Sequence, residues 1–401
     1  MVRQRSIERN DFEIDSETLQ SHEKPSCLGQ AGRQDYVYAH VLCDVCCRQH
    51  CKRRCCCEGE GMEKGINGID GMKIYYQNGT VTDIGNKLSI DKFSVLVTHI
   101  DQRVVMTYTG DSLVRNVEDE LVHLFEKFSN LYFPDANLYY GGLSIIPKGI
   151  LDGGQSSDSS IDKNKFIELI DKLESSAIDI YRHIYVGDCQ YLVSTLQNLI
   201  QAIEYCFMQY YIQIAQIDIP EDLLVETKLW NEWEEYITSS HQSRQLIFYL
   251  ETFFTKLYSI LDIMVKIVYE LENPTESFTS ITKLRSTRML WGDRKKIAIN
   301  NSLNSIFEDC NTIRMIESLR NEAVHNGSWE YQPKVYIITE NRKIVERYML
   351  FPDFEEGALS TVKNRRHFFS TGAKVNDVLL SIHNDFYKRL LITLQQINST
   401  F

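Results

Sequence analysis

Arg320-Asn-Glu-Ala-Val-His-Asn-Gly327 closes a segment of this 401-residue chain in which apolar residues recur at helical spacing. Four residues separate Arg320 from His325, and an asparagine directly follows the arginine. Asn326-Gly327 comes next, and such residues tolerate the left-handed backbone in which many helices end. The sequence therefore predicts a helix C-terminus that presents a guanidinium, an amide and an imidazole.

Segments of similar periodicity lie on both sides of this helix end. Their apolar residues recur at steps of three and four, which gives each segment one apolar face that must be buried. Asn273-Pro274 ends the helix that precedes the one with the motif. Because bundled helices bury several such faces together, we expect residues 161–401 to form a mainly helical domain. The predicted helical stripes cover residues 166–184, 192–214, 243–272, 303–325 and 375–397.

Two short runs after the motif have the composition of β-strands. Val335–Thr339 and Lys343–Arg347 are rich in β-branched residues, and Glu340-Asn-Arg342 lies between them. The sequence therefore predicts a β-hairpin inside the C-terminal part of the helical domain.

Residues 62–152 predict a small accessory domain of α+β type. Asn78-Gly79 suits a tight hairpin turn, and a helix is expected over Ser112–Leu131. Neither a glycine-rich phosphate loop nor a metal-ligand cluster occurs here. Residues 153–160 are rich in glycine and serine and are expected to be a flexible linker. The predicted strands are Lys73–Tyr76, Thr80–Ile84, Phe93–Thr98 and Arg103–Tyr108.

Cysteines divide the chain unevenly. Of 11 cysteines, only Cys189, Cys206 and Cys310 lie beyond residue 57, among apolar helical residues where a thiol packs as a small hydrophobe. Cys43 and Cys46 have the spacing of a zinc ligand pair, but the second half of a zinc finger is missing. We expect residues 1–61 to be a disordered, cysteine-rich extension, or a segment upstream of a natural start at Met62. A zinc-dependent nucleic-acid binder is the alternative.

The motif and the order of the helices together resemble the HEPN domains, a family of helical bundles. Many members are metal-independent ribonucleases whose arginine-to-histidine motif lies near the end of a late helix, after a long apolar helix. The resemblance covers about the last half of the chain. It implies a fold that is mainly α, a HEPN-like bundle with a C-terminal β-hairpin, preceded by the α+β domain. It also implies a homodimer, because two subunits commonly complete the site in this family.

One position departs from a branch of the family. HEPN toxins that are paired with nucleotidyltransferase antitoxins usually have a tyrosine two residues after the histidine, and this chain has Gly327 there. Regulation by modification at that position is therefore not expected. Other HEPN domains lack nuclease activity and act as binding or assembly modules.

The residue types of the motif suit RNA cleavage without a metal or other cofactor. His325 can take the proton of a ribose 2′-hydroxyl, because imidazole titrates near neutral pH. Arg320 can hold the phosphate with its planar guanidinium, and Asn321 can orient the imidazole or the phosphate. Five residues turn an ideal helix by about 140°, so Arg320 and His325 do not share one face. The end of the helix could relax this angle, or a second subunit could complete the site.

The motif also has a purely structural interpretation. Cations at a helix C-terminus complement the negative end of the helix dipole and contribute roughly 0.3–1 kcal/mol each. Asp262 is expected to be a polar group with a local partner, although a site acid is the alternative. Trp291 could stack on an RNA base or belong to the core.

The net charge of −12 excludes broad, charge-driven coating of nucleic acid, so any RNA contact must be local. A second basic segment is Lys363 to His367, followed by Phe368 and Phe369. A solvated face is the alternative for both segments. The segment predicted to bind RNA contains Lys283, Arg285, Arg288, Arg294, Lys295 and Lys296.

The sequence thus predicts an endoribonuclease that leaves 2′,3′-cyclic phosphate and 5′-hydroxyl ends, with Arg320, Asn321 and His325 as catalytic residues and no metal. From the resemblance we expect a toxin or phage-defence effector with RNA, including transfer RNA, as its substrate. An antitoxin or regulatory protein is an expected partner. The N-terminus lacks a secretion signal and no apolar run is long enough for a membrane span, so we expect a cytoplasmic protein. The alternative function is a non-catalytic HEPN-like binding or scaffold module.

Overall fold

The structure is a computed structural model, and it describes residues 69–83, 93–100, 103–174, 179–219, 233–292, 297–299 and 302–401. The cysteine-rich extension expected over residues 1–61 lies outside these ranges, and so does its zinc alternative. The described residues belong to one compact unit.

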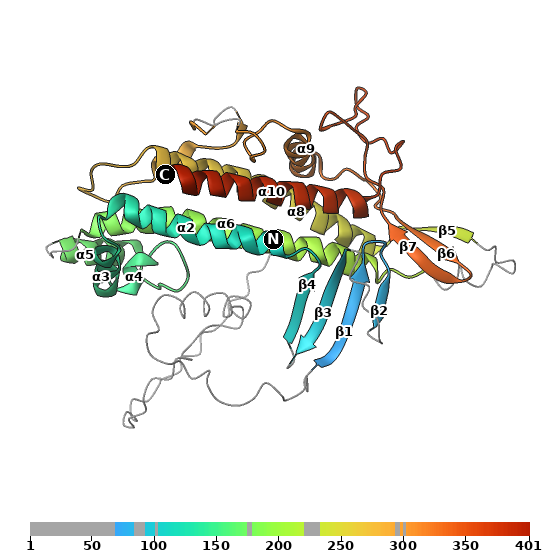
Figure 1. Ribbon diagram of the computed structural model, residues 1–401, viewed down its shortest axis with the longest axis horizontal. Helices are drawn as coiled ribbons and strands as arrows, with labels where there is room; N and C mark the ends of the chain where they lie inside the picture. The colour runs from blue at the N-terminus through green and yellow to red at the C-terminus, as the bar shows by residue number, and fades with distance from the viewer. Residues whose placement is uncertain are drawn as a thin grey trace, which may run out of the picture. The chain divides into compact units, whose positions relative to one another are not determined.

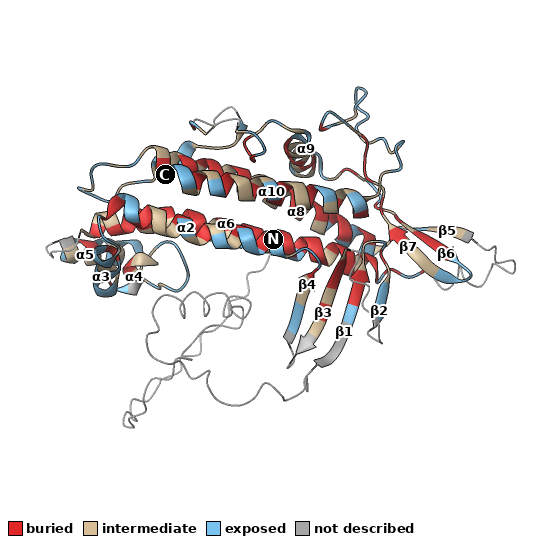
Figure 2. Cartoon of the chain, viewed as in Figure 1, coloured by how far each residue is buried: buried red, intermediate tan, exposed pale blue. Residues whose placement is uncertain are grey.

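Long helices form the centre of this unit (Figure 1). Helix α6, Ile180–Ile214, packs along α8, His241–Glu272, and α9, Asn311–Asn326, packs on α8. The C-terminal helix α10, Val375–Thr400, packs against α2, Ser112–Tyr132, which also contacts α6. Figure 2 shows the buried residues on the faces that these helices turn toward one another. The helical bundle expected from the apolar periodicity is therefore present.

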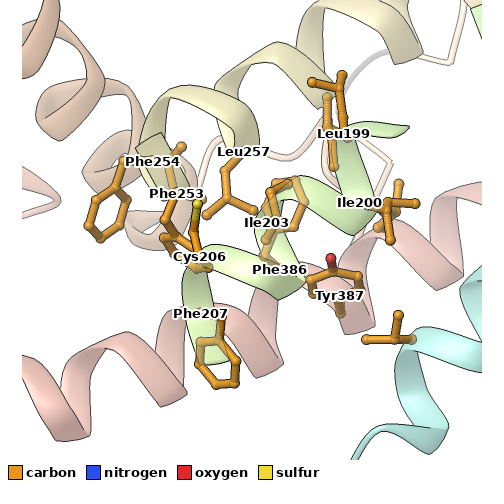
Figure 3. Packing of buried hydrophobic residues seen from close by; sticks show 14 of the residues in the cluster. Leu199, Ile200, Ile203, Cys206, Phe207, Phe253, Phe254, Leu257, Phe386 and Tyr387 are labelled. Carbon is orange, nitrogen blue, oxygen red and sulfur yellow. The ribbon is translucent and has the colours of Figure 1, made fainter. Parts of the chain in front are cut away.

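The bundle core joins side chains from three of these helices (Figure 3). Phe207 from α6, Phe253 from α8 and Phe386 from α10 are each at most 1% exposed. Burial of one such side chain contributes about 1.5–3 kcal/mol relative to its exposure to water. This core fixes the position of α8, on which the motif helix lies.

Local signals set the ends of the long helices. Ser240 and Ser243 form a capping box at the start of α8, in which each side chain bonds the other residue's backbone N–H. The Asp179 side chain accepts from the Arg182 backbone N–H at the start of α6. Asn273 ends α8 just before Pro274, as the sequence predicts.

The N-terminal strands form an antiparallel sheet in the order β2-β1-β3-β4. Next to this sheet, Phe93 lies with its ring centroid 5.4 Å from that of Phe207 on α6. The turn between the first two strands docks on strand β7, where the Arg347 backbone N–H donates to the Asn78 carbonyl at 2.8 Å. The strands are β1 Ile69–Tyr76, β2 Val81–Asp83, β3 Ser94–Ile100 and β4 Arg103–Tyr108.

The structure does not separate two cores at residues 153–160. Helix α2, which was expected to belong to an accessory domain, shares one buried cluster with α6, α8 and α10. The 153–160 segment consists of turns and is attached to α6 by a 2.7 Å hydrogen bond from Gln155 to Asp188. The apolar face of α2 is buried on α6 and α10, and the composition of residues 153–160 gives no sign of this long-range contact. Short helices flank the segment: α3 Ala136–Ile145, α4 Lys148–Leu151 and α5 Lys163–Glu174.

Two smaller sheets lie in the C-terminal half. Strands β6, Val335–Glu340, and β7, Lys343–Tyr348, pair antiparallel at the place of the predicted hairpin. A strand that the sequence analysis missed, β5, Trp233–Thr238, adds to the other edge of β6. Strands β8, Phe354–Glu355, and β9, Ala358–Leu359, form a two-stranded pair that lies against α9.

Two predicted helical stripes have different bounds in the structure. The 303–325 helix starts only at Asn311, because Asn304 has a left-handed φ of 60° and the Ile306 N–H donates to the Thr393 side chain. Residues 166–184 divide between α5 and α6, and the residues between these helices lie outside the described ranges.

Candidate functional site

The motif occupies the last turns of α9, where this helix lies on α8. Arg320 contacts Tyr258 of α8, whereas Ala323 and Val324 lie near its residues 248–256. The two helices are therefore antiparallel. Helix α9 continues through Asn326 and ends at Gly327, whose φ of 96° is open to glycine but strained for other residues.

Arg320 is held from two sides. Its Nη1 donates to Oδ1 of Asn321 at 2.8 Å, and its guanidinium carbon lies 4.7 Å from the centroid of the Tyr258 ring. Such a cation–π contact contributes about 0.5–2 kcal/mol. Burial and the nearby Glu317 and Asp262 raise the pKa of Tyr258, and Arg320 opposes this shift. The contact of Tyr258 with Arg320 was not predicted from the sequence, because nothing distinguishes Tyr258 from the other large side chains of the α8 segment.

His325 lies on the outward side of the same helix and is exposed. Since α9 stays helical to Asn326, the angle between Arg320 and His325 remains about 140°. The helix end therefore does not bring the two side chains onto one face. The structure brings Arg320 and Asn321 into contact, but no contact with His325 occurs among the hydrogen bonds and ion pairs of the described residues.

Glu322 connects the motif helix to the second basic segment. It is 5% exposed, and its carboxylate accepts from His367 Nε2 at 3.0 Å, Arg366 Nη1 at 3.5 Å and Asn326 Nδ2 at 2.8 Å. A buried carboxylate is costly without such partners. The sequence alone does not reveal this link, because Arg366 is 44 positions away from Glu322 in the chain. We call residues 361–367 the basic hairpin.

An open groove lies beside the motif between α8 and α9. Its walls carry two exposed apolar side chains, Phe248 at 62% and Val324 at 51%. Glu251 and Lys256 bring opposite charges into the groove, and burial raises the pKa of Glu251. The complete lining is Phe248, Glu251, Thr252, Thr255, Lys256, Ala323 and Val324.

The segment predicted to bind RNA follows the far end of α8. Arg285 donates to the carbonyls of Asn273 and Pro274, and the N–H of Ser286 donates to the buried carboxylate of Glu270. Glu270 is twelve residues beyond Tyr258, about 18 Å along the helix. Lys283 and Arg288 are exposed on this segment, which includes the short 3₁₀ helix η1, Arg285–Arg288. Arg294, Lys295 and Lys296 lie outside the described residues.

Asp262 and Trp291, for which the sequence allowed either a site role or a structural role, both have structural partners. Asp262 accepts from the backbone N–H of Trp291 at 2.7 Å, which gives its carboxylate the polar partner expected. The Trp291 ring stacks on Phe307, with a centroid distance of 5.9 Å and an interplanar angle of 19°. These contacts fasten the chain that follows α8 to the bundle.

The described cysteines are free thiols within the helical unit. Burial raises the pKa of Cys206 to about 11 and that of Cys189 well above its ordinary value, so both behave as apolar side chains. Among the residues that the structure covers, no three His, Cys, Asp or Glu side chains are grouped so as to bind a metal ion.

Comparison with protein families identifies the fold around the motif. Residues 189–368 match the family model of the Cthe2314-like HEPN domains. Over these residues the chain is therefore similar to the HEPN family. No curated protein and no solved structure matches the chain significantly.

The matched range contains every part of the site described above. It begins within α6, includes α8 and the whole of α9, and ends directly after the basic hairpin. The helices α2 and α10, which complete the core, lie outside the matched range. Within the described ranges, no helix is both long and apolar enough to cross a membrane.

Proposed function

We propose that this chain is a metal-independent endoribonuclease whose catalytic residues are Arg320, Asn321 and His325. The observation that carries the proposal is the place of these residues, together on the last turns of α9 in a HEPN domain. HEPN membership is compatible with a nuclease or RNA-related role. The exposed imidazole and the neighbouring guanidinium supply the two groups that such a cleavage needs.

The proposed reaction is an internal transfer at one phosphodiester. His325 takes the proton of the ribose 2′-hydroxyl, and the 2′-oxygen attacks the adjacent phosphorus. The bond from phosphorus to the 5′-oxygen breaks, and this oxygen takes up the proton that the imidazolium can return. Arg320 stabilises the negative charge that develops on the phosphoryl oxygens. The products are a 2′,3′-cyclic phosphate and a 5′-hydroxyl.

The angle between Arg320 and His325 supports a site that two copies complete. In one copy the two side chains point about 140° apart, so a phosphate that contacts both is reached more easily from two motifs. The groove beside the motif supports the same arrangement, because it exposes Phe248 and Val324 and contains both Glu251 and Lys256. Across a two-fold axis each acid can face the other copy's lysine. We therefore propose a homodimer through α8 and α9.

A toxin or phage-defence setting, with an antitoxin or regulatory partner and a cytoplasmic RNA target, is part of the same proposal. It rests on the resemblance to HEPN ribonucleases alone.

The second candidate is a non-catalytic binding or scaffold module. The engagement of Arg320 favours it, since the guanidinium already contacts both Asn321 and Tyr258. In this case the motif would stabilise the helix end and leave RNA intact.

Cleavage of total RNA and transfer RNA in excess EDTA separates the two candidates. We expect the wild type to cut and to leave cyclic phosphates, and Arg320→Ala and His325→Ala to lose the activity. Removal of one such group typically costs about 10²–10⁴ in rate. Arg115→Ala and His123→Ala, at exposed positions of α2, are matched controls and should cut normally. No cutting, or equal cutting by all variants, would refute the catalytic assignment.

Mixing the two inactive variants tests the composite site. If Arg320 of one copy works with His325 of the other, a mixed dimer contains one intact site and activity returns. Continued inactivity after subunit exchange, verified with differently tagged copies, would contradict a shared site.

A further inference from the structure

The basic hairpin is a built element of the HEPN domain and not a loose loop. Val362 and Arg365 exchange two backbone hydrogen bonds of 2.8 and 2.9 Å, and Lys363 has the left-handed φ of 54° that a two-residue turn requires. The turn therefore holds Lys363 and Arg365 at a fixed tip, where both residues are exposed.

A single buried carboxylate closes the base of the hairpin. Asp353 accepts from the N–H and hydroxyl groups of both Ser370 and Thr371, at 2.6 to 3.0 Å. These bonds, first among them that of the Ser370 hydroxyl, hold the pKa of Asp353 far below its ordinary value. The backbone of Asp353 also bonds Ser360 on the outgoing limb and Phe368 on the returning limb. Both limbs are thus fixed to one residue.

Both limbs of the hairpin contact α9, the outgoing limb through Leu359 and the returning limb through Arg366 and His367. The Leu359 N–H donates to the Ser318 hydroxyl at 3.3 Å, and one helical turn later Glu322 accepts from Arg366 and His367. Ser318, Glu322 and His325 are spaced at four and three residues, so they form one stripe of the helix. The basic hairpin therefore lies on the side of α9 that continues to His325.

Cations consequently border the outward face of the motif on two sides. Arg320 lies on the flank that faces α8, and the basic hairpin lies on the flank of Glu322. Because the chain has a net charge of −12, a polyanion is expected to bind it only where cations are grouped locally, as they are here. Phe368, at the foot of the hairpin, is 38% exposed and offers an apolar ring to an unpaired base.

We propose that the basic hairpin binds the phosphate backbone of single-stranded RNA beside the motif, through Lys363 and Arg365. Glu322 and Asp353 are positioning residues, because they hold the hairpin against α9. This inference rests on the proposed function and names the element that grips its substrate. An unpaired strand is the substrate because only an unpaired base can stack on Phe368.

Binding of a short 2′-O-methyl oligoribonucleotide to wild-type protein tests the inference without cleavage. The methyl group removes the proton that the reaction needs, so affinity can be read by fluorescence anisotropy whether or not the site is active. We expect Lys363→Glu with Arg365→Glu to weaken binding by roughly tenfold or more. The slope of log K against log salt should fall by about 1.4 in magnitude for two lost phosphate contacts on a single strand.

Two further variants keep the result interpretable. Lys163→Glu with Lys165→Glu reverses the same number of charges on exposed positions of α5 and should leave affinity and slope unchanged. Lys363→Gln with Arg365→Gln removes charge without reversing it and should lose a smaller part of the affinity. Circular dichroism and the unfolding midpoint show that each variant is folded.

The outcomes separate the hairpin from the catalytic proposal. Unchanged affinity and slope in both hairpin variants overturn the hairpin proposal, even if the wild type cuts RNA in EDTA. Failure of the wild type to bind the oligonucleotide overturns it as well, while the cleavage assay judges the catalytic residues independently. Equal loss of affinity for duplex and single-stranded RNA contradicts the unpaired strand.

Discussion

The guanidinium of Arg320 is oriented before any substrate binds. Asn321 accepts a hydrogen bond from the guanidinium, and the guanidinium carbon lies over the Tyr258 ring, so the side chain is held on the α8 side of the motif. Fixing a long side chain in advance removes part of the entropy that binding would otherwise cost. At the scale of single residues, Tyr258 is therefore the support of the proposed phosphate contact.

Replacement of Tyr258 by leucine should lower the rate of RNA cleavage by roughly five- to tenfold, since a cation–π contact is worth about 1 kcal/mol. Tyr258→Phe keeps the ring and should retain most of the activity. The measurement is kcat/KM on one RNA substrate for wild type and both variants. Equal loss in the two variants would assign the effect to the hydroxyl group and contradict a role for the ring.

The sequence predicted the motif residues and their helix but not their neighbours. Arg320, Asn321 and His325 are local in the chain, so their spacing and helical periodicity suffice to place them. Tyr258 and His367 reach the motif only through packing of α8 and the basic hairpin on α9, to which single-sequence periodicity is blind. The six basic residues chosen for RNA binding formed a cluster in sequence, but Lys283, Arg285 and Arg288 follow the other end of α8.

At the scale of elements, the turn between β1 and β2 is a docking point for the helical domain. Its backbone meets Arg347 of β7, whose guanidinium donates to the carbonyls of Gly79 and Ile217. Asn376, at the start of α10, bonds both Gln77 and Arg347. The strands were predictable from alternation, but this attachment was not, because its partners lie more than 250 residues apart.

Gly79→Ala should lower the free energy of unfolding by about 1–3 kcal/mol. Gly79 has a φ of 70°, and a Cβ there would lie 2.5 Å from the Arg347 carbonyl oxygen. Gly154→Ala is the matched control, since Gly154 has a φ of 79° with no atom within 4 Å of such a Cβ. Chemical denaturation should show the larger loss for Gly79→Ala, and equal losses would mean that strain alone is responsible.

At the scale of the whole molecule, a buried polar cluster joins the N-terminal sheet to the central helices. Glu204 of α6 accepts from His383 of α10 at 2.8 Å, and Tyr108 of β4 and Tyr387 lie beside them. Burial by itself would raise the pKa of Glu204, but His383 and the two phenols outweigh it and lower the pKa. Glu118 of α2 faces the same cluster, and burial and Glu204 raise its pKa.

Glu204→Gln should lower the free energy of unfolding at neutral pH by roughly 1–3 kcal/mol, as expected when the charged acceptor of a buried hydrogen bond is replaced by a neutral amide. A carboxyl with a lowered folded pKa stabilises above its unfolded pKa of about 4.3 and loses this effect as pH falls through the folded value. The difference between wild type and variant should therefore shrink below about pH 4.3.

Denaturant unfolding across this pH range measures the effect. Glu118→Gln is the control with the opposite sign, because a raised pKa means that the charged form opposes folding. It should not destabilise the protein at neutral pH. A gap between wild type and Glu204→Gln that stays constant from neutral to acid pH would contradict the assigned charge state.

The residues that fix the base of the basic hairpin, with Asp353 at their centre, are different from the residues that its tip exposes. We call the contacts of Asp353 the clamp. All six hydrogen bonds at its base use Asp353, Ser360, Phe368, Ser370 and Thr371, and none uses a side chain of the tip. The tip can therefore exchange its side chains at little cost to folding. Substitution of Lys363, Asn364 and Arg365 should therefore change which targets the hairpin binds, while the hydrogen bonds of Asp353 keep the hairpin in place.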